Sequence, residues 1–143
     1  MINAIQFIQQ HGVEKAREVV EGAPSSATHF NQNSLGNHYA KEVLRKREFQ
    51  WAWFNKLTQS WYYDFAEYNH FELSELKRFL DSLDIIKELG SVESAKANLF
   101  EMYDDSSCDW VHEKARLYDY KHLTVGRVKQ AIADYEAIGG EHV

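Results

Sequence analysis

Hydrophobic and polar positions alternate most regularly in the stretch from residue 49 to residue 65. Every second residue there is aromatic, first in one run and then, after a polar segment at 55–60, in another. The aromatic positions of the two runs are Phe49, Trp51 and Trp53, followed by Trp61, Tyr63 and Phe65. A two-residue period is typical of strands with one buried face. The pattern therefore predicts a β-hairpin over 49–65 whose large rings form the core of a small sheet.

A period of three to four residues marks the segments on both sides of this hairpin. Near the N-terminus it predicts two short helices, 2–10 and 13–21, that meet at Gly12 as a C-cap. After the hairpin, leucines three or four residues apart predict a helix that starts near Leu73 and ends by Gly90. Further helices are expected at 92–102, 110–120 and 125–138.

The segment between the N-terminal helices and the hairpin is less regular. We expect a short strand at 27–30 and a polar loop at 31–37. Residues 38–48 fit a helix or a strand, and the β-branched and aromatic neighbours favour a strand. These elements predict an α+β fold, in which a small antiparallel sheet centred on the hairpin is packed with helices from both ends of the chain.

The length of 143 residues favours one domain. Within it we expect an N-terminal helix pair at 1–22, a sheet at 27–65 and a helical part at 72–140. The sequence has no apolar run long enough to span a bilayer and no pattern of a signal peptide. The single cysteine, Cys108, cannot form an internal disulfide. We therefore expect a soluble cytoplasmic protein.

Charge is unevenly distributed along the chain. The net charge is −6, and the whole excess of Asp and Glu lies after residue 71. Such a chain is repelled by nucleic-acid phosphates unless it gathers its cations in one place. The Lys and Arg residues at 41–47, which precede the aromatic run, form such a group. The acidic second half also allows the opposite interpretation, in which its carboxylates mimic DNA.

Candidate catalytic chemistry is sparse. Cys108 and His112 are four residues apart, so they would meet on one face of a helix, but a zinc site needs two further ligands. The acidic neighbours of Cys108 disfavour a reactive thiolate. The chain also lacks a nucleophile elbow and a glycine-rich phosphate loop. We therefore expect no enzymatic activity, no cofactor and no bound metal.

Several short motifs resemble those of a known group of proteins. These are Phe7-Ile8, the run Gly12–Glu18, the run Gly22–Phe30 with its Ala-Pro turn and Ala-Thr-His-Phe strand, and Leu73-Ser74-Glu75-Leu76-Lys77. Together with the Trp-rich hairpin they resemble small accessory proteins of temperate tailed phages and enterobacterial prophages, in patches over most of the chain. The polar insertion at 31–37 departs from that pattern. The group has no established activity, so the resemblance implies no catalytic residues.

A small acidic chain with such a resemblance is expected to bind a host protein and to modulate or inhibit it. The partner would be part of a bacterial defence or nucleic-acid-processing complex. Aromatic and arginine side chains dominate binding energy at protein interfaces, which makes several residues candidates for the contact. They are Arg45, Arg47, Tyr62, Tyr68, His70 and Trp110. The alternative is a nucleic-acid-binding protein that uses the basic and aromatic region from Lys41 to Phe54. The sequence leaves self-association open.

Overall fold

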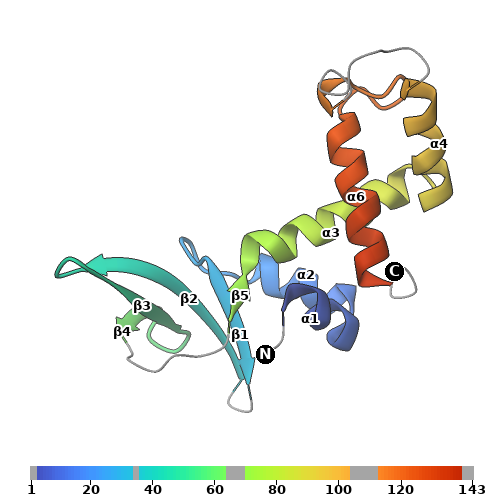
Figure 1. The fold of residues 1–143 in the computed structure, drawn as a ribbon. Coiled ribbons are helices and arrows are strands. Elements are labelled where there is room, and N and C mark those ends of the chain that lie inside the picture. The colour runs from blue at the N-terminus through green and yellow to red at the C-terminus, as the bar shows by residue number, and fades with distance from the viewer. Residues whose placement is uncertain (1–2, 34–35, 64–69, 104–112, 140–143) are drawn as a thin grey trace. The chain divides into compact units, whose positions relative to one another are not determined.

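The computed structural model describes residues 3–33, 36–63, 70–103 and 113–139. It has the expected α+β fold with an antiparallel sheet (Figure 1). In chain order the elements are α1 (Ala4–His11), α2 (Val13–Glu21), β1 (His29–Asn33), β2 (Gly36–Arg45), β3 (Glu48–Asn55), β4 (Ser60–Tyr63), β5 (Phe71–Glu72), α3 (Leu73–Glu88), α4 (Val92–Tyr103) and α6 (Val125–Ile138). The five strands are ordered β4-β3-β2-β1-β5.

The chain divides into two compact units, Met1–Lys77 and Arg78–Val143. The first unit holds α1, α2 and the sheet, and the second holds α4 and α6. The boundary between the units falls inside α3. The expectation that the whole chain behaves as one domain stays a prediction.

In the first unit the N-terminal helices pack on one face of the sheet. Asn3 caps α1 through a capping box with Gln6, and Gly12 with φ 87° separates α1 from α2. The Phe7 ring of α1 lies 5.5 Å from the ring of Phe30 in β1 and 5.6 Å from the ring of Phe71 in β5. These contacts bury the apolar side of the helix pair against the strands at the β5 end of the sheet.

The aromatic hairpin is confirmed as β3 and β4, but its two aromatic rows lie on opposite faces. Trp53 pairs with Tyr62 and Phe54 pairs with Trp61, so odd-numbered residues of β3 face the same side as even-numbered residues of β4. Trp51 and Trp53 therefore lie on one face and Trp61 and Tyr63 on the other. Phe65 lies outside the described residues.

The expectation that all these rings form a core is wrong for Phe49 and Tyr63. Trp53 is 1% exposed, whereas Phe49 is 70% and Tyr63 49% exposed. Trp51 and Trp61 are half-buried. The physical reason is that the rings are divided between the two faces of the sheet. The helices α1 and α2 pack on the face of Tyr63 near β1 and β5, and Phe49 lies on the other face beside the β2–β3 turn.

The sequence predicts a polar loop at 31–37, but part of this segment is strand. β1 continues to Asn33 and β2 starts at Gly36, with five residue pairs between the strands. Polar residues can form this ladder because the hydrogen bonds come from the backbone. The strand interpretation of 38–48 is confirmed, since β2 runs to Arg45 and β3 begins at Glu48.

The second unit has a helical core of its own. α4 and α6 contribute most of it, together with the C-terminal part of α3 and the loop before α6. The fully or nearly buried side chains include Ile86, Leu99, Leu117, Val125, Val128 and Ile132. Thr124 caps α6 by accepting a hydrogen bond from the backbone N–H of Arg127, and Gly139 with φ 100° ends it.

The helix expected at 110–120 is wrong for its second half, and residues 104–112 lie outside the described ranges. Residues 115–120 are not helical. Arg116 pairs with Thr124 in an isolated bridge, and the Leu117 N–H donates to the Leu123 carbonyl at 3.0 Å. Leu117 and Leu123 are both buried, so the chain folds back on itself to place two leucines in the same core. In the part of the chain that the structure describes, no helix combines the length and the apolar character needed to cross a membrane.

Candidate binding surface

The turn between β2 and β3 consists of two residues, Lys46 and Arg47, flanked by the pair Arg45 and Glu48. Both turn residues have positive φ, 52° and 68°. Two positive φ values are the mark of a type I′ turn, which favours Asn-Gly because other residues crowd their Cβ atoms there. Each non-glycine residue in this region costs roughly 1 kcal/mol. The chain thus places two cations in a turn whose backbone conformation favours Asn and Gly.

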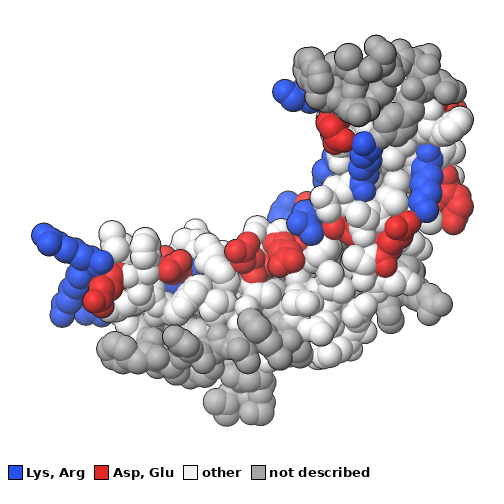
Figure 2. Space-filling view, in the orientation of Figure 1, with Lys and Arg blue, Asp and Glu red and all other residues white. Residues whose placement is uncertain are grey.

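Two large apolar side chains lie directly behind this turn. Leu44 and Phe49 are partners across the β2–β3 ladder and are 66% and 70% exposed. They share one face of the sheet because paired residues point to the same side. We call Leu44, Arg45, Lys46, Arg47 and Phe49 the hairpin tip. Figure 2 shows its cations as a blue group at the far end of the ribbon.

On the opposite face of the same strands, cations lie over aromatic rings. The Lys41 Nζ lies 4.4 Å from the centre of the Trp61 ring, and the Arg45 guanidinium carbon lies 4.3 Å from the centre of the Tyr63 ring. Both distances are within the range of cation–π attraction. We call Lys41, Arg45, Trp61 and Tyr63 the cation–aromatic face.

The face that carries Trp53 has a cluster of three half-buried rings. The His70 ring lies 4.2 Å from Trp51 and 4.7 Å from His29, and His29 lies 4.8 Å from Trp51. Burial lowers the pKa of His70, and burial followed by the charge of His70 lowers the pKa of His29. Glu42 and Glu72 oppose the shift of the His29 pKa. Both imidazoles are therefore held in their neutral form near pH 7.

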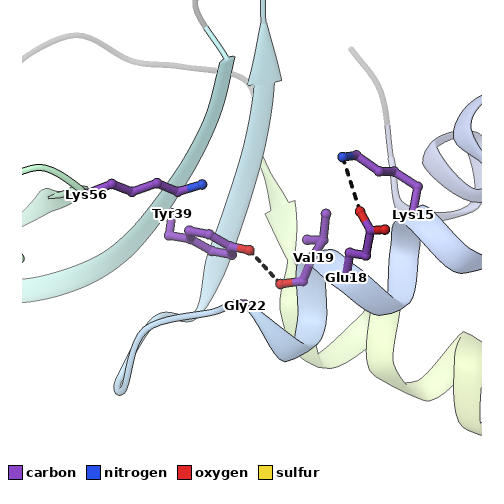
Figure 3. A pocket seen from close by; sticks show the side chains of 6 residues that line it. All are labelled: Lys15, Glu18, Val19, Gly22, Tyr39 and Lys56. Carbon is purple, nitrogen blue, oxygen red and sulfur yellow. Dashed lines mark hydrogen bonds and ion pairs between the residues drawn. The ribbon is translucent and has the colours of Figure 1, made fainter.

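A small cavity of about 240 Å³ lies between α2, β2 and the β3–β4 turn (Figure 3). Lys15, Glu18, Val19, Gly22, Tyr39 and Lys56 line it. The Tyr39 hydroxyl donates to the Val19 carbonyl at 2.6 Å, and burial raises the pKa of Tyr39. A Cβ on Gly22 would lie 3.4 Å from that hydroxyl and 3.0 Å from the Glu18 carbonyl oxygen. The geometry indicates that Tyr39 ties β2 to α2, which is a structural role.

The residues predicted to contact a partner have different surroundings. Arg45 and Arg47 are brought together, exposed, at the hairpin tip. Tyr62 is 42% exposed, and His70 packs in the ring cluster. Tyr68 and Trp110 lie outside the described residues. Cys108 and His112, the two possible zinc ligands in the sequence, also lie outside them. Within the described ranges, no three metal-ligating side chains gather closely enough to hold an ion.

The sequence does not identify Leu44 and Phe49 as surface residues. It predicts Phe49 in a core, because this residue continues the alternation of Trp51 and Trp53. The available signal was the basic pair Lys46 and Arg47, which interrupts two strand-like runs at the spacing of a two-residue turn. Residues next to such a turn lie at the end of a ribbon, where few neighbouring side chains can bury them.

Comparison with known proteins adds no relative. No protein-family model matches the chain. No curated protein and no solved structure matches it either. The resemblance to phage accessory proteins therefore rests on the sequence motifs alone.

Proposed function

We propose that the chain is an accessory protein of a temperate phage or prophage that binds a host protein through the hairpin tip. Binding would modulate or inhibit that protein, which belongs to a bacterial defence or nucleic-acid-processing complex. The observation that carries this proposal is the exposed pair Leu44 and Phe49 beside three consecutive cations.

The chemistry of the tip fits a protein partner. An exposed leucine and phenylalanine side by side cost free energy in water and recover it only when another surface covers them. Lys46 and Arg47 follow this pair at the end of the ribbon, while Arg45 points to the opposite face, so the tip combines an apolar pair with two adjacent cations, as protein interfaces combine an apolar centre with a polar rim. The complementary surface would be an apolar pocket bordered by carboxylates.

The strain of the turn supports the same proposal. Lys46 and Arg47 occupy a conformation that favours Asn-Gly, which fits a role for their charges in contacts outside the isolated chain. A turn of only two residues also holds the tip rigidly. Less conformational entropy is then lost when a partner binds.

The test is affinity capture from a nuclease-treated bacterial lysate, followed by titration of the purified partner. Leu44→Ser and Phe49→Ser should each weaken binding at least about tenfold, as expected for central interface anchors. Leu57→Ser is the matched control, because Leu57 is 96% exposed on the other hairpin turn. All three variants should keep the melting temperature of the parent protein.

Two results would contradict the proposal. One is a captured partner whose affinity is the same for the parent chain, Leu44→Ser and Phe49→Ser. The other is the loss of all captured proteins on nuclease treatment, which would show that nucleic acid mediates the association.

A further inference from the structure

The cation–aromatic face differs in charge from the opposite face of the same sheet. Alternation along β2 and β3 places Lys41, Arg45 and Glu48 on this face and Glu42 on the other. Lys56 adds to the first group, since its Nζ lies 5.8 Å from the centre of the Tyr39 ring. Glu72 lies on the opposite face. It pairs with His29, which pairs with Ala40 on its other side, and Ala40 points away from the face that carries its neighbour Lys41. Among the strand and turn residues, the cation–aromatic face therefore carries Lys41, Arg45, Lys56 and Glu48, and the other face carries Glu42 and Glu72. At the Tyr39 end of the cation–aromatic face, α2 adds the ion pair of Lys15 with Glu18.

We propose that this face binds a single-stranded nucleic acid. The positive charge of the face would bind the phosphate backbone, and its aromatic rings would stack on the bases. Base–aromatic stacking combined with cations that follow the backbone is the usual basis of binding to single strands. The inference shares Arg45 with the host-protein proposal but depends on Lys41, Trp61 and Tyr63, whereas that proposal depends on Leu44 and Phe49, so variants of these residues test the two separately.

The contacts give each side chain a role. The ammonium of Lys41 lies over the Trp61 ring and donates to the Ser26 hydroxyl, and it would move onto a phosphate when a base takes its place on the ring. The guanidinium of Arg45 lies over the Tyr63 ring, and its outer surface offers a second stacking plane. Tyr63 is 49% exposed with the guanidinium over its ring, so a base would stack on the guanidinium and not directly on Tyr63. Lys41 and Arg45 are four residues apart on β2, which corresponds to about 13 Å, so the surface spans a few nucleotides.

A duplex fits this surface poorly. Paired bases in a duplex are stacked on one another and cannot reach rings that lie on the face of a sheet. A single strand can turn its bases outward. The same chemistry serves RNA and single-stranded DNA, so the experiment includes both.

The experiment measures fluorescence anisotropy of labelled oligo(dT) and oligo(rU) of about 12 nucleotides, and of a duplex of equal length. The full chain is titrated at about 50 mM salt and then at increasing salt. We expect both single strands to bind at least about tenfold more tightly than the duplex. The logarithm of the association constant should fall with the logarithm of salt concentration by about 0.7 for each phosphate contacted.

Two pairs of variants locate the surface. Glu48→Gln and Glu42→Gln each remove one negative charge from neighbouring parts of the ribbon, but on opposite faces. Glu48→Gln should tighten binding by at least about threefold, whereas Glu42→Gln should change it much less, because the effect of an exposed charge is local. Lys41→Gln should weaken binding and reduce the salt slope by about 0.7. Lys87→Gln on α3 is its control for the loss of one charge.

Stacking is tested at the rings. Trp61→Ala should weaken binding at least about fivefold, and Trp61→Phe should restore most of the affinity. A thermal melt checks that Trp61→Ala is folded, and Lys41→Gln tests the same surface without altering a ring. The proposal is overturned if no single strand binds up to about 100 µM protein. It is also overturned if the duplex binds equally well, or if Glu42→Gln and Glu48→Gln act alike.

Discussion

Trp53 and Trp61 show how residues of one type in one hairpin can differ in what they contribute. Trp53 is 1% exposed, whereas Trp61 is half-buried beneath Lys41. Replacing Trp53 with Ala should cost about 3–5 kcal/mol, because it removes a buried ring and leaves a cavity. Trp61→Ala should cost less than half as much. Urea unfolding measures both, and equal losses would show that the two rings share one core.

The paired imidazoles predict a dependence of stability on pH. Burial lowers the pKa of His29 and of His70 below the ordinary value of about 6.5. The unfolded chain therefore binds protons at a higher pH than the folded chain does. The stability of the neutral pair is present above about pH 6.5 and is lost as pH falls through the lower folded values.

We expect the melting temperature to fall between about pH 7.5 and pH 5.5, and the fall to be smaller in His70→Phe. This variant keeps a ring against Trp51 and removes one proton site. The groups facing the pair are Glu42 and Glu72, whose charges favour protonation of His29 and so reduce the effect. If His70→Phe leaves the pH dependence of the melting temperature unchanged, groups other than His70 cause that dependence.

At the scale of elements, the alternation of side chains predicted where β3 and β4 lie but not which faces their rings share. That relation depends on register, and a shift of one residue moves every side chain of a strand to the other face. The composition of the polar segment at 55–60 does not predict the register between β3 and β4. The register is fixed by the local geometry of the turn, where Asn55 Oδ1 accepts from the Leu57 N–H at 2.9 Å and Gln59 has a φ of 55°. The Leu-rich helix α3 was predictable because its period is long and regular.

The β2–β3 turn predicts opposite effects on stability and binding. Lys46→Asn with Arg47→Gly should stabilise the fold by about 1 kcal/mol or more, because Asn-Gly suits two positive φ values. The same change should weaken binding of the host protein, since two cations are lost from the hairpin tip. Gln59→Gly is the control, as it relieves a φ of 55° in the β3–β4 turn and leaves the tip intact. If the double variant is more stable and binds the host protein as tightly as the parent chain does, the two cations of the turn are not needed for binding.

At the scale of the whole molecule, the fold class followed from patterns along the chain, whereas the candidate surface did not. The hairpin tip and the cation–aromatic face depend on which neighbours lie across the strands, as Leu44 with Phe49 and Lys41 over Trp61 show. Such contacts are set by register and long side chains, which a linear pattern does not contain. Arg45 and Arg47 were named from the sequence because their charge and type are visible there.

The division into two units also makes a prediction for the whole chain. In the second unit Asp134 is 3% exposed and accepts hydrogen bonds from Arg78, Gln130 and the buried Ser82, the last at 2.7 Å. Asp134→Ala leaves these donors without their acceptor and should cost at least about 1–3 kcal/mol. The exposed ion pair of Glu136 with Lys96 provides the control, since Glu136→Ala should cost less than about 1 kcal/mol.

The boundary at Lys77 and Arg78 lies inside α3, so separating the two units would break a continuous helix. We therefore expect the chain to unfold as one domain. Asp134→Ala should then reduce hydrogen-exchange protection in β3 of the first unit as much as in α6 of the second. If protection falls in α6 while β3 keeps the value of the parent protein, the two units unfold independently and the chain has two domains.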